Sequence, residues 1–275
     1  MDLRLLPFRF PGIAGVGCAF QMALPARPGA SQAERGNISL EAGLGGAADG
    51  EAADVATEIA RVMANRAALR DGLGLRGLVE AKQVHGVVTL FEPEAQELCR
   101  VPGREADGLA ASRAPEREMT GLMIKTADCQ PVLVAHKDGS HIMALHSGWK
   151  GNRRDYPRLA VEEFCEHYRL PARELSAVRG PSLGPGRAEF TRFRQEWGEE
   201  FAAFFDTRTM CMDLWRLTRE QLRRAGIPHE RIYGIDLCTR SLARDFFSYR
   251  ADRGCGRQAS LIWLEGTGTD QTINI

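Results

Sequence analysis

One stretch, residues 125–151, constrains the fold of this chain more than any other. It holds two apolar segments, residues 132–135 and 141–146, on either side of the turn sequence Lys137-Asp138-Gly139-Ser140. An Asp-Gly pair between apolar, alternating segments is a strong signal for a β-hairpin with a two-residue turn. We therefore expect an antiparallel hairpin at the centre of the fold.

The two-residue turn also predicts the register of this hairpin. It places Pro131 opposite His146 and Cys129 opposite Gly148. Because side chains alternate between faces with a period of two, Cys129 and His146 share a face as diagonal neighbours, with backbones roughly 7–8 Å apart. A three-residue loop would put them on opposite faces. A thiolate and an imidazole this close can share a metal ion or form a nucleophile–base pair.

Composition limits the class of protein. The 275 residues show no internal repeat and no low-complexity linker, which favours a single domain over residues 1–275. Lys plus Arg and Asp plus Glu both number 36, so no overall charge attracts nucleic acid or an anionic membrane. Seven cysteines without Cys-x-x-Cys spacing argue against a disulfide framework and a zinc ribbon, and favour the cytoplasm. No signal-peptide core or 18-residue apolar run is present.

Periodicity and turn residues predict the other elements. We expect helices over residues 52–73, 155–168, 195–205 and 213–225, and a short helix over 241–247. We expect strands over residues 3–10, 78–91, 175–179, 232–237 and 259–264. Residues 11–50 are expected to be an irregular N-terminal segment, with a short strand near 37–40 as one option, and residues 92–118 are expected to be mostly loop.

Three residues are candidates for a metal site. A catalytic zinc ion has three protein ligands, often His and Cys, and one open position. The hairpin offers Cys129 and His146, and His85 lies beside Gly86 in the predicted strand 78–91. The alternative is a buried cysteine and two hydrogen-bonded histidines. The other histidines fall on predicted helices or at the far end of the hairpin: His167, His229, His136 and His141.

Further polar residues near the hairpin have two interpretations each. Asp128 points to the face opposite Cys129 unless a bulge intervenes, so it is either a catalytic carboxylate or a turn residue. The Gly-rich segment around Lys150 leads toward a helix and can bind an anion. Arg250 and Arg257 are either anion ligands or ordinary exposed loop residues. The sequence contains no Walker loop, dinucleotide fingerprint or Gly-x-Ser-x-Gly motif.

Four motifs together resemble a known family. They are Gln83-Val84-His85-Gly86, Ala106-Asp107-Gly108-Leu109, Thr126-Ala127-Asp128-Cys129-Gln130-Pro131-Val132-Leu133 and His146-Ser147-Gly148-Trp149-Lys150-Gly151. In this order they resemble the YfiH-like family, also called the multicopper polyphenol oxidase or laccase-domain family, or the zinc-dependent purine nucleoside phosphorylases. Residues 236–239, 246–250 and 256–262 resemble the family's C-terminal part, so the match spans about residues 65–265.

This resemblance implies a fold, a cofactor and an activity. The fold is α/β (α+β), a single domain of mixed β-sheets packed together with helices outside. Zinc, with copper as an option, is held by His85, Cys129 and His146. The activity is phosphorolysis of adenosine, inosine, guanosine and methylthioadenosine to the free base and a ribose 1-phosphate, with adenosine deamination as a second activity. Other members are linked to copper-dependent phenol oxidation and to peptidoglycan-precursor editing. The implied partners are a nucleoside and phosphate, without nucleic acid or membrane, for a monomer or small homo-oligomer.

Roles follow for individual residues. For deamination the metal would activate a water molecule, and Asp128 or Asp107 would carry the proton beside the catalytic Cys129. For phosphorolysis the candidate phosphate ligands are three basic residues, and Gln83 is a candidate substrate contact. The three basic residues are Lys150, Arg250 and Arg257.

The chain also departs from the family pattern. The family's usual Ser-Thr-Arg segment corresponds to residues 15–21, which lack that Thr and Arg. Lys150 stands where the family has Arg, and a lysine cannot grip phosphate with two parallel hydrogen bonds as an arginine does. These departures place the choice of substrate, and activity itself, in question.

Three other functions compete with the nucleoside enzyme. A copper oxidase would use the same His and Cys ligands, although six histidines are too few for a full multicopper oxidase. A metal-free cysteine hydrolase would use Cys129 as nucleophile and His146 as base. An inactive member of the family would bind its ligand without turnover.

Overall fold

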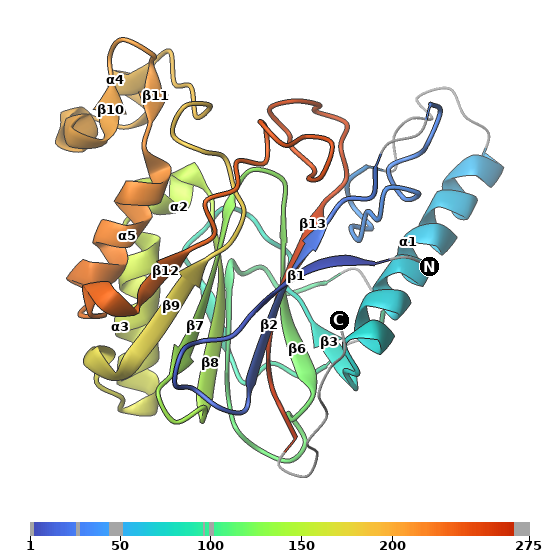
Figure 1. The fold of residues 1–275 in the computed structure, drawn as a ribbon, viewed down its shortest axis with the longest axis horizontal. Coiled ribbons are helices and arrows are strands. Elements are labelled where there is room, and N and C mark those ends of the chain that lie inside the picture. Colours follow the sequence, from blue (N-terminus) through green and yellow to red (C-terminus); the bar gives the residue numbers. More distant parts are fainter. Residues whose placement is uncertain (1–2, 26–27, 44–51, 96, 99–101, 267–275) are drawn as a thin grey trace.

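Two mixed β-sheets pack face to face between helices (Figure 1). The computed structural model describes residues 3–25, 28–43, 52–95, 97–98 and 102–266. Cys99 and the polar tail after Gly266 lie outside these residues. The predicted α+β single domain is confirmed by this architecture and by the solved structures compared below.

The strands have the following bounds. The five-stranded sheet has the order β1 (Arg4–Phe8), β2 (Val16–Met22), β13 (Gln258–Leu264), β6 (Thr120–Thr126) and β3 (Gly77–Val79). The six-stranded sheet has the order β12 (Ile232–Gly234), β9 (Leu175–Arg179), β7 (Gln130–His136), β8 (His141–Ser147), β5 (Gly108–Ser112) and β4 (Thr89–Phe91). A separate small pair is formed by β10 (Phe205–Asp206) and β11 (Cys211–Met212).

Helices cover both outer faces of the sheets. The α-helices are α1 (Ala52–Gly72), α2 (Trp149–Arg153), α3 (Tyr156–Tyr168), α4 (Phe193–Glu196) and α5 (Leu214–Arg224). Short 3-10 helices are η1 (Ala172–Glu174), η2 (Glu199–Phe204) and η3 (His229–Arg231). In Figure 1, α1 lies on one side of the sheets, and α2, α3 and α5 lie on the other. No helix among the described residues is long and apolar enough to cross a membrane.

The core follows the alternation of side chains along the strands. On β7, Leu133 points into the apolar layer between the two sheets, while Val132 and Val134 pack against α3 through Tyr156 and Phe164. The outer face of the five-stranded sheet packs in the same way against α1. Because β7 is buried on both faces, it is apolar almost throughout.

The central hairpin has the predicted register. Strands β7 and β8 pair antiparallel, with Pro131 opposite His146 and Gln130 opposite Ser147. Gly139 in the turn has a φ of 71°, which glycine adopts without strain. The loop between the strands has four residues, 137–140, rather than the predicted two, and the N–H of Gly139 donates to the carbonyl of His136 at 2.9 Å. Because this loop also has an even number of residues, the predicted register is kept.

One predicted strand is wrong in a way that matters for the site. Residues 78–91 form β3 and β4, which belong to different sheets, and the loop between them carries His85. His85 has a φ of 59°, in the left-handed region that interrupts a strand. The apolar residues of this segment serve two sheets rather than one strand, and the loop brings His85 from one sheet toward the other.

Other predicted elements also need correction. Residues 37–40 form no strand, residues 241–247 form turns rather than a helix, and residues 195–205 are divided into α4 and η2. The division falls at Gly198, which has a φ of 106°. The segments expected to be irregular contain β2 and β5. Strand β5 was missed because its small residues lack the β-branched and aromatic side chains typical of strands.

Candidate metal centre and cavity

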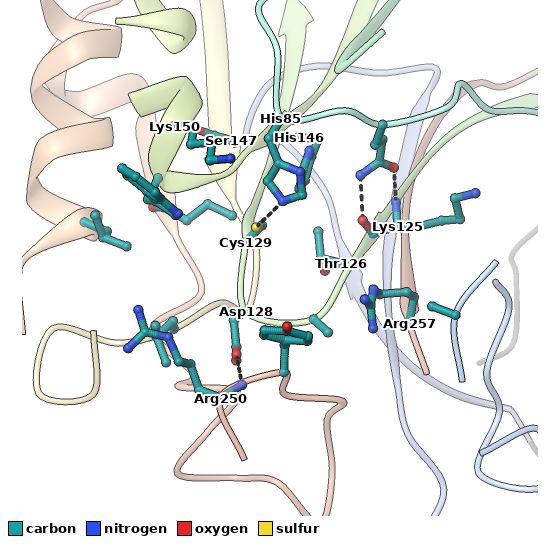
Figure 2. Close-up of a pocket in the computed structure, with 18 of the residues that line it drawn as sticks. His85, Lys125, Thr126, Asp128, Cys129, His146, Ser147, Lys150, Arg250 and Arg257 are labelled. Atoms are coloured by element: carbon teal, nitrogen blue, oxygen red, sulfur yellow. Dashed lines mark hydrogen bonds between the residues drawn. The ribbon is translucent and has the colours of Figure 1, made fainter. Parts of the chain in front are cut away.

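The three predicted metal ligands converge (Figure 2). Cys129 directly precedes β7, His146 lies on β8, and His85 comes from the loop between β3 and β4. The Sγ atom of Cys129 lies 3.7 Å from Nε2 of His85, and the ligand atoms of all three residues lie within 4.8 Å of one another. These separations suit a tetrahedral site with bonds of about 2.0–2.3 Å. Among the described residues, no fourth His, Cys, Asp or Glu joins this group.

Gly148 makes room for the ligands. It lies next to Cys129 at the end of the hairpin, and a Cβ atom at this position would stand 2.7 Å from Cδ2 of His85 and 3.2 Å from Sγ of Cys129. Any larger residue would push the imidazole out of place. The glycine in the His-Ser-Gly-Trp motif is therefore required by the close approach of the ligands.

Asp107 orients the ring of His146 and the backbone of His85 through hydrogen bonds. Its buried Oδ1 accepts hydrogen bonds from Nδ1 of His146 at 2.6 Å and from the backbone N–H of His85 at 3.0 Å, and Oδ2 accepts from the N–H of Gly86 at 2.6 Å. Burial opposes the ionised carboxylate, but the hydrogen bond and charge of His146 and the backbone donors outweigh it and lower the pKa of Asp107. An ionised carboxylate accepts hydrogen bonds but cannot donate them. Nδ1 of His146 therefore carries the proton that is shared with Asp107, and Nε2 is available to bind a metal.

The pKa values of Cys129 and His146 shift in opposite directions and exchange their order. Burial alone would raise the pKa of the Cys129 thiol, but the charge of His146 and hydrogen bonds from His146 and His85 lower it to about 6. Burial would lower the pKa of His146, but the charge of Cys129 and the hydrogen bond to Asp107 raise it to about 9. The thiolate is the form that binds metals, so this environment prepares Cys129 as a ligand.

A cavity of about 690 Å³ opens beside these residues. Its polar and charged lining includes Ser39, Glu41, Gln83, Lys125, Thr126, Asp128, Gln130, Ser147, Lys150, Arg250 and Arg257, and its apolar lining includes Trp149, Leu183, Phe190, Leu214 and Tyr249. The volume is that of a typical small-molecule site. Asp107 is not part of this lining.

Gln83 holds the loop that carries His85. Its side-chain amide donates to the carbonyl of Lys125 at 2.7 Å and accepts from the N–H of Lys125 at 2.8 Å. The amide therefore extends the hydrogen-bonding pattern of β6 to this loop. Gln83 lines the cavity as expected, and these two bonds also make it a positioning residue for His85.

Asp128 joins the hairpin to the C-terminal motif. It has a φ of 89°, and its carboxylate accepts hydrogen bonds from the hydroxyl of Thr239 and from the backbone N–H of Arg250, both at 2.7 Å. Each carboxylate oxygen thus has a fixed partner. Asp128 lines the cavity, and its hydrogen bonds place the segment that carries Arg250 at the cavity wall.

The three basic candidates lie on two sides of the metal ligands. In Figure 2, Lys150 and Arg250 lie on one side of Cys129, whereas Arg257 lies on the other. The guanidinium of Arg250 lies 5.2 Å from the ring of Phe190, so this side is bordered by an aromatic wall. The three basic residues are therefore divided between two sides of the metal ligands.

Lys125 is a cavity residue that the sequence reasoning missed. Its buried ammonium lies 2.8 Å from Glu80 and 3.6 Å from Glu41, and Glu80 also pairs with Arg66. Burial is the main cause that lowers the pKa of Lys125 to about 8. The available signal was a single charge within an apolar strand, since buried charges need partners.

Comparisons with known proteins identify the family of this chain. The sequence profile of the family described as "Multi-copper polyphenol oxidoreductase laccase" matches residues 51–265. A Xylella fastidiosa protein named purine nucleoside phosphorylase is 35% identical over 86% of this chain and 88% of its own. The Escherichia coli purine nucleoside phosphorylase YfiH is 33% identical over 53% of this chain and 60% of its own.

Solved structures of similar proteins share the fold. A Bacillus licheniformis hypothetical protein YfiH matches with a TM-score of 0.74 and 24% identity over 91% of this chain and 93% of its own. A Neisseria meningitidis protein matches with a TM-score of 0.70 and 26% identity over 95% of this chain and 99% of its own. The profile match and the relatives together establish that this chain belongs to the YfiH-like family of laccase-type domains.

Proposed function

We propose that this protein is a zinc-dependent purine nucleoside phosphorylase. Its substrates would be adenosine, inosine, guanosine and methylthioadenosine, and its products the free base and the sugar 1-phosphate. The observation that carries the proposal is the convergence of His85, Cys129 and His146 at a cavity of about 690 Å³. It is supported by the 35% identity to a protein named purine nucleoside phosphorylase.

The donor set suits zinc. Two imidazoles and a thiol with a lowered pKa match the nitrogen and thiolate ligands that zinc prefers, and Asp107 orients His146 in the manner of many zinc sites. Zinc, when bound, supplies Lewis acidity at the edge of the cavity.

The chain's own residues would position the two substrates. In phosphorolysis the bond between the sugar C1′ and the base nitrogen breaks, the electron pair leaves with the base, and a phosphate oxygen bonds to C1′. The sugar passes through oxocarbenium character, as in glycoside cleavage. The protein's main task is therefore to hold phosphate against C1′ and to exclude water.

Of the basic candidates, we favour Arg257 as the phosphate ligand. It lies on the side of Cys129 away from Lys150 and Arg250 (Figure 2). Lys150 and Arg250 border the aromatic side, which suits the nucleoside. An Arg257→Gln variant should raise KM for phosphate about tenfold or more, while Lys150→Gln should mainly raise KM for the nucleoside. The reverse result would exchange the two assignments.

Deamination of adenosine remains a proposed second activity. Of the two candidate carboxylates, Asp128 and Asp107, Asp128 is the one that lines the cavity, and both of its oxygens already accept hydrogen bonds. Each oxygen keeps a second lone pair, so Asp128 can still accept a proton while both of these bonds persist. The proposed setting is the cytoplasm, with small-molecule substrates only.

A copper oxidase is the alternative that the family's other name suggests. Two histidines and a cysteine also resemble a blue-copper ligand set. However, the described residues contain one group of three metal-ligating side chains, whereas a multicopper enzyme needs several. Metal analysis of protein purified without added metal would separate zinc from copper.

Product analysis tests the proposed function. Zinc-loaded protein is incubated with inosine or adenosine, with and without phosphate, and the products are separated by chromatography. The proposal predicts hypoxanthine or adenine only when phosphate is present. Base release without phosphate would indicate a hydrolase, and conversion of adenosine to inosine would establish the deaminase. Absence of any product from zinc-loaded protein would contradict the proposal and favour an inactive member of the family.

A further inference from the structure

Three buried polar atoms at the cavity have no hydrogen-bond partner among the described residues. They are Oγ1 of Thr126, Oε1 of Gln130 and Oγ of Ser147, and each residue is at most 2% exposed. A buried polar atom without a partner costs about 1–3 kcal/mol, and native proteins contain few of them. Because these three residues line the same cavity, a bound ligand is the natural source of the missing partners.

The amide of Gln130 is locked in one orientation. Its nitrogen donates to Oδ1 of Asn152 at 3.1 Å and to Oγ1 of Thr218 at 2.8 Å. Asn152 in turn donates to Thr218 and to Gln221, both at 2.8 Å. This buried network fixes the nitrogen on the helix side, so the unpartnered Oε1 of Gln130 is a fixed acceptor that requires a donor.

Ser147 lies beside this acceptor. It is the cross-strand partner of Gln130 in the β7–β8 register, so the two side chains share a face with Cβ atoms about 4.5–5.5 Å apart. Each directly follows a metal ligand, Cys129 or His146. A carbonyl oxygen accepts only, whereas a hydroxyl both donates and accepts. Together they can bind a ligand edge that has an N–H donor next to an acceptor.

Aromatic and aliphatic side chains line the same cavity as Gln130 and Ser147. Trp149, Phe190, Leu183 and Leu214 line the same cavity and belong to one apolar cluster, with the Trp149 and Phe190 rings 5.8 Å apart. Figure 2 places Ser147 on the same side of Cys129 as Lys150, away from Lys125 and Arg257. An aromatic wall with a neutral donor–acceptor pair fits a planar heterocycle better than it fits phosphate.

We propose that Gln130 and Ser147 recognise the six-position edge of a purine base. This inference rests on the proposed function and adds the group that selects the base. In a 6-oxopurine, N1–H meets Oε1 of Gln130 and O6 accepts from Ser147. In a 6-aminopurine, which binds turned over so that the two groups exchange places, the amino group donates to Oε1 and N1 accepts from the Ser147 hydroxyl, which is the donor in both cases. A purine without a six-substituent has no donor for Gln130.

Ligand binding without turnover tests this recognition. Calorimetry on zinc-loaded protein in the absence of phosphate compares Kd for inosine with Kd for unsubstituted purine riboside. The wild type should bind inosine about tenfold more tightly, which corresponds to one net hydrogen bond. In Ser147→Ala this ratio should fall below about threefold, and in Gln130→Met it should approach one. Ser260→Ala, a change of another buried serine outside the cavity, should keep the wild-type ratio.

The outcomes separate this inference from the proposed function. An unchanged inosine-to-purine-riboside ratio in Ser147→Ala, or equal binding of both nucleosides by the wild type, overturns the recognition even if phosphorolysis occurs. A ratio lost in Ser147→Ala but kept in Ser260→Ala supports the recognition even if the wild type yields no product with phosphate. If neither nucleoside binds, the recognition is wrong.

Discussion

At the scale of single residues, Asp107 shows how one buried group organises the site. Its two oxygens fix the His146 ring and the loop of His85, so one carboxylate couples ligands from two sheets. The sequence predicted Asp107 as a site residue through its motif, but not this place behind His146. Its position depends on β5, which was not recognisable from its small residues.

Replacing this carboxylate should weaken metal binding more than it alters the fold. In Asp107→Ala, His146 loses the acceptor that fixes its tautomer, so zinc affinity should fall roughly 10–100-fold. Competition with a chromophoric chelator measures this. Asp138→Ala, in the exposed turn at the other end of the hairpin, is the matched control and should bind zinc as the wild type does. Equal zinc affinity in Asp107→Ala would remove Asp107 from this role.

At the scale of elements, the hairpin was the most predictable part of the molecule. The Asp138-Gly139 turn and the alternating strands were enough to predict the register and the shared face of Cys129 and His146, and both are confirmed. The origin of His85 was predicted wrongly, because strand patterns cannot show that β3 and β4 enter different sheets. His85 was a candidate ligand because it lies beside Gly86, and the family motifs strengthened that assignment.

Substitutions of two glycines of this hairpin should affect different properties: one should lower zinc affinity, and the other should lower stability. Gly148 has a φ of −76°, which alanine adopts readily, but a Cβ there would meet His85 at 2.7 Å. Gly148→Ala should therefore lose zinc affinity at least about tenfold with little loss of stability. Gly139 has a φ of 71°, and a Cβ there would meet the carbonyl oxygen of Ala14 at 2.4 Å.

Gly139→Ala should consequently lower the free energy of unfolding by about 1–3 kcal/mol and keep its zinc. Urea unfolding and metal analysis of both variants check the pair. The interpretation is wrong if Gly148→Ala retains wild-type zinc affinity, or if Gly139→Ala is as stable as the wild type.

At the scale of the whole molecule, both sheets contribute residues to the cavity: Lys125 and Thr126 lie on β6, and Gln130, His146 and Ser147 lie on β7 and β8. The family resemblance predicted mixed β-sheets packed together with helices outside, whereas the absence of repeats and linkers predicted only a single domain. The buried group of Lys125, Glu80 and Arg66 was not predictable, since it joins β6, the segment after β3, and α1. Such long-range pairs are visible only when the layers are in place.

The pKa of Lys125 makes stability depend on pH. Burial lowers it to about 8, well below the 10.5 of an unperturbed lysine. Between these values the unfolded chain binds a proton that the folded chain does not, so stability rises with pH. Relative to Lys125→Met, the wild type should gain up to about 3 kcal/mol in unfolding free energy between pH 8 and pH 10.5. Urea unfolding at both pH values measures this, and an identical pH dependence of the two proteins would contradict it.

We propose that phosphorolysis requires zinc held by Cys129 and the two histidines. The measurement is zinc content and phosphate-dependent release of hypoxanthine from inosine, on the same samples of wild type, Cys129→Ala and Cys165→Ala. Cys165 lies on α3, away from the cavity lining, and serves as the control. We expect about one zinc and full turnover in the wild type and in Cys165→Ala, and loss of both in folded Cys129→Ala. Stoichiometric zinc or undiminished turnover in Cys129→Ala would contradict it.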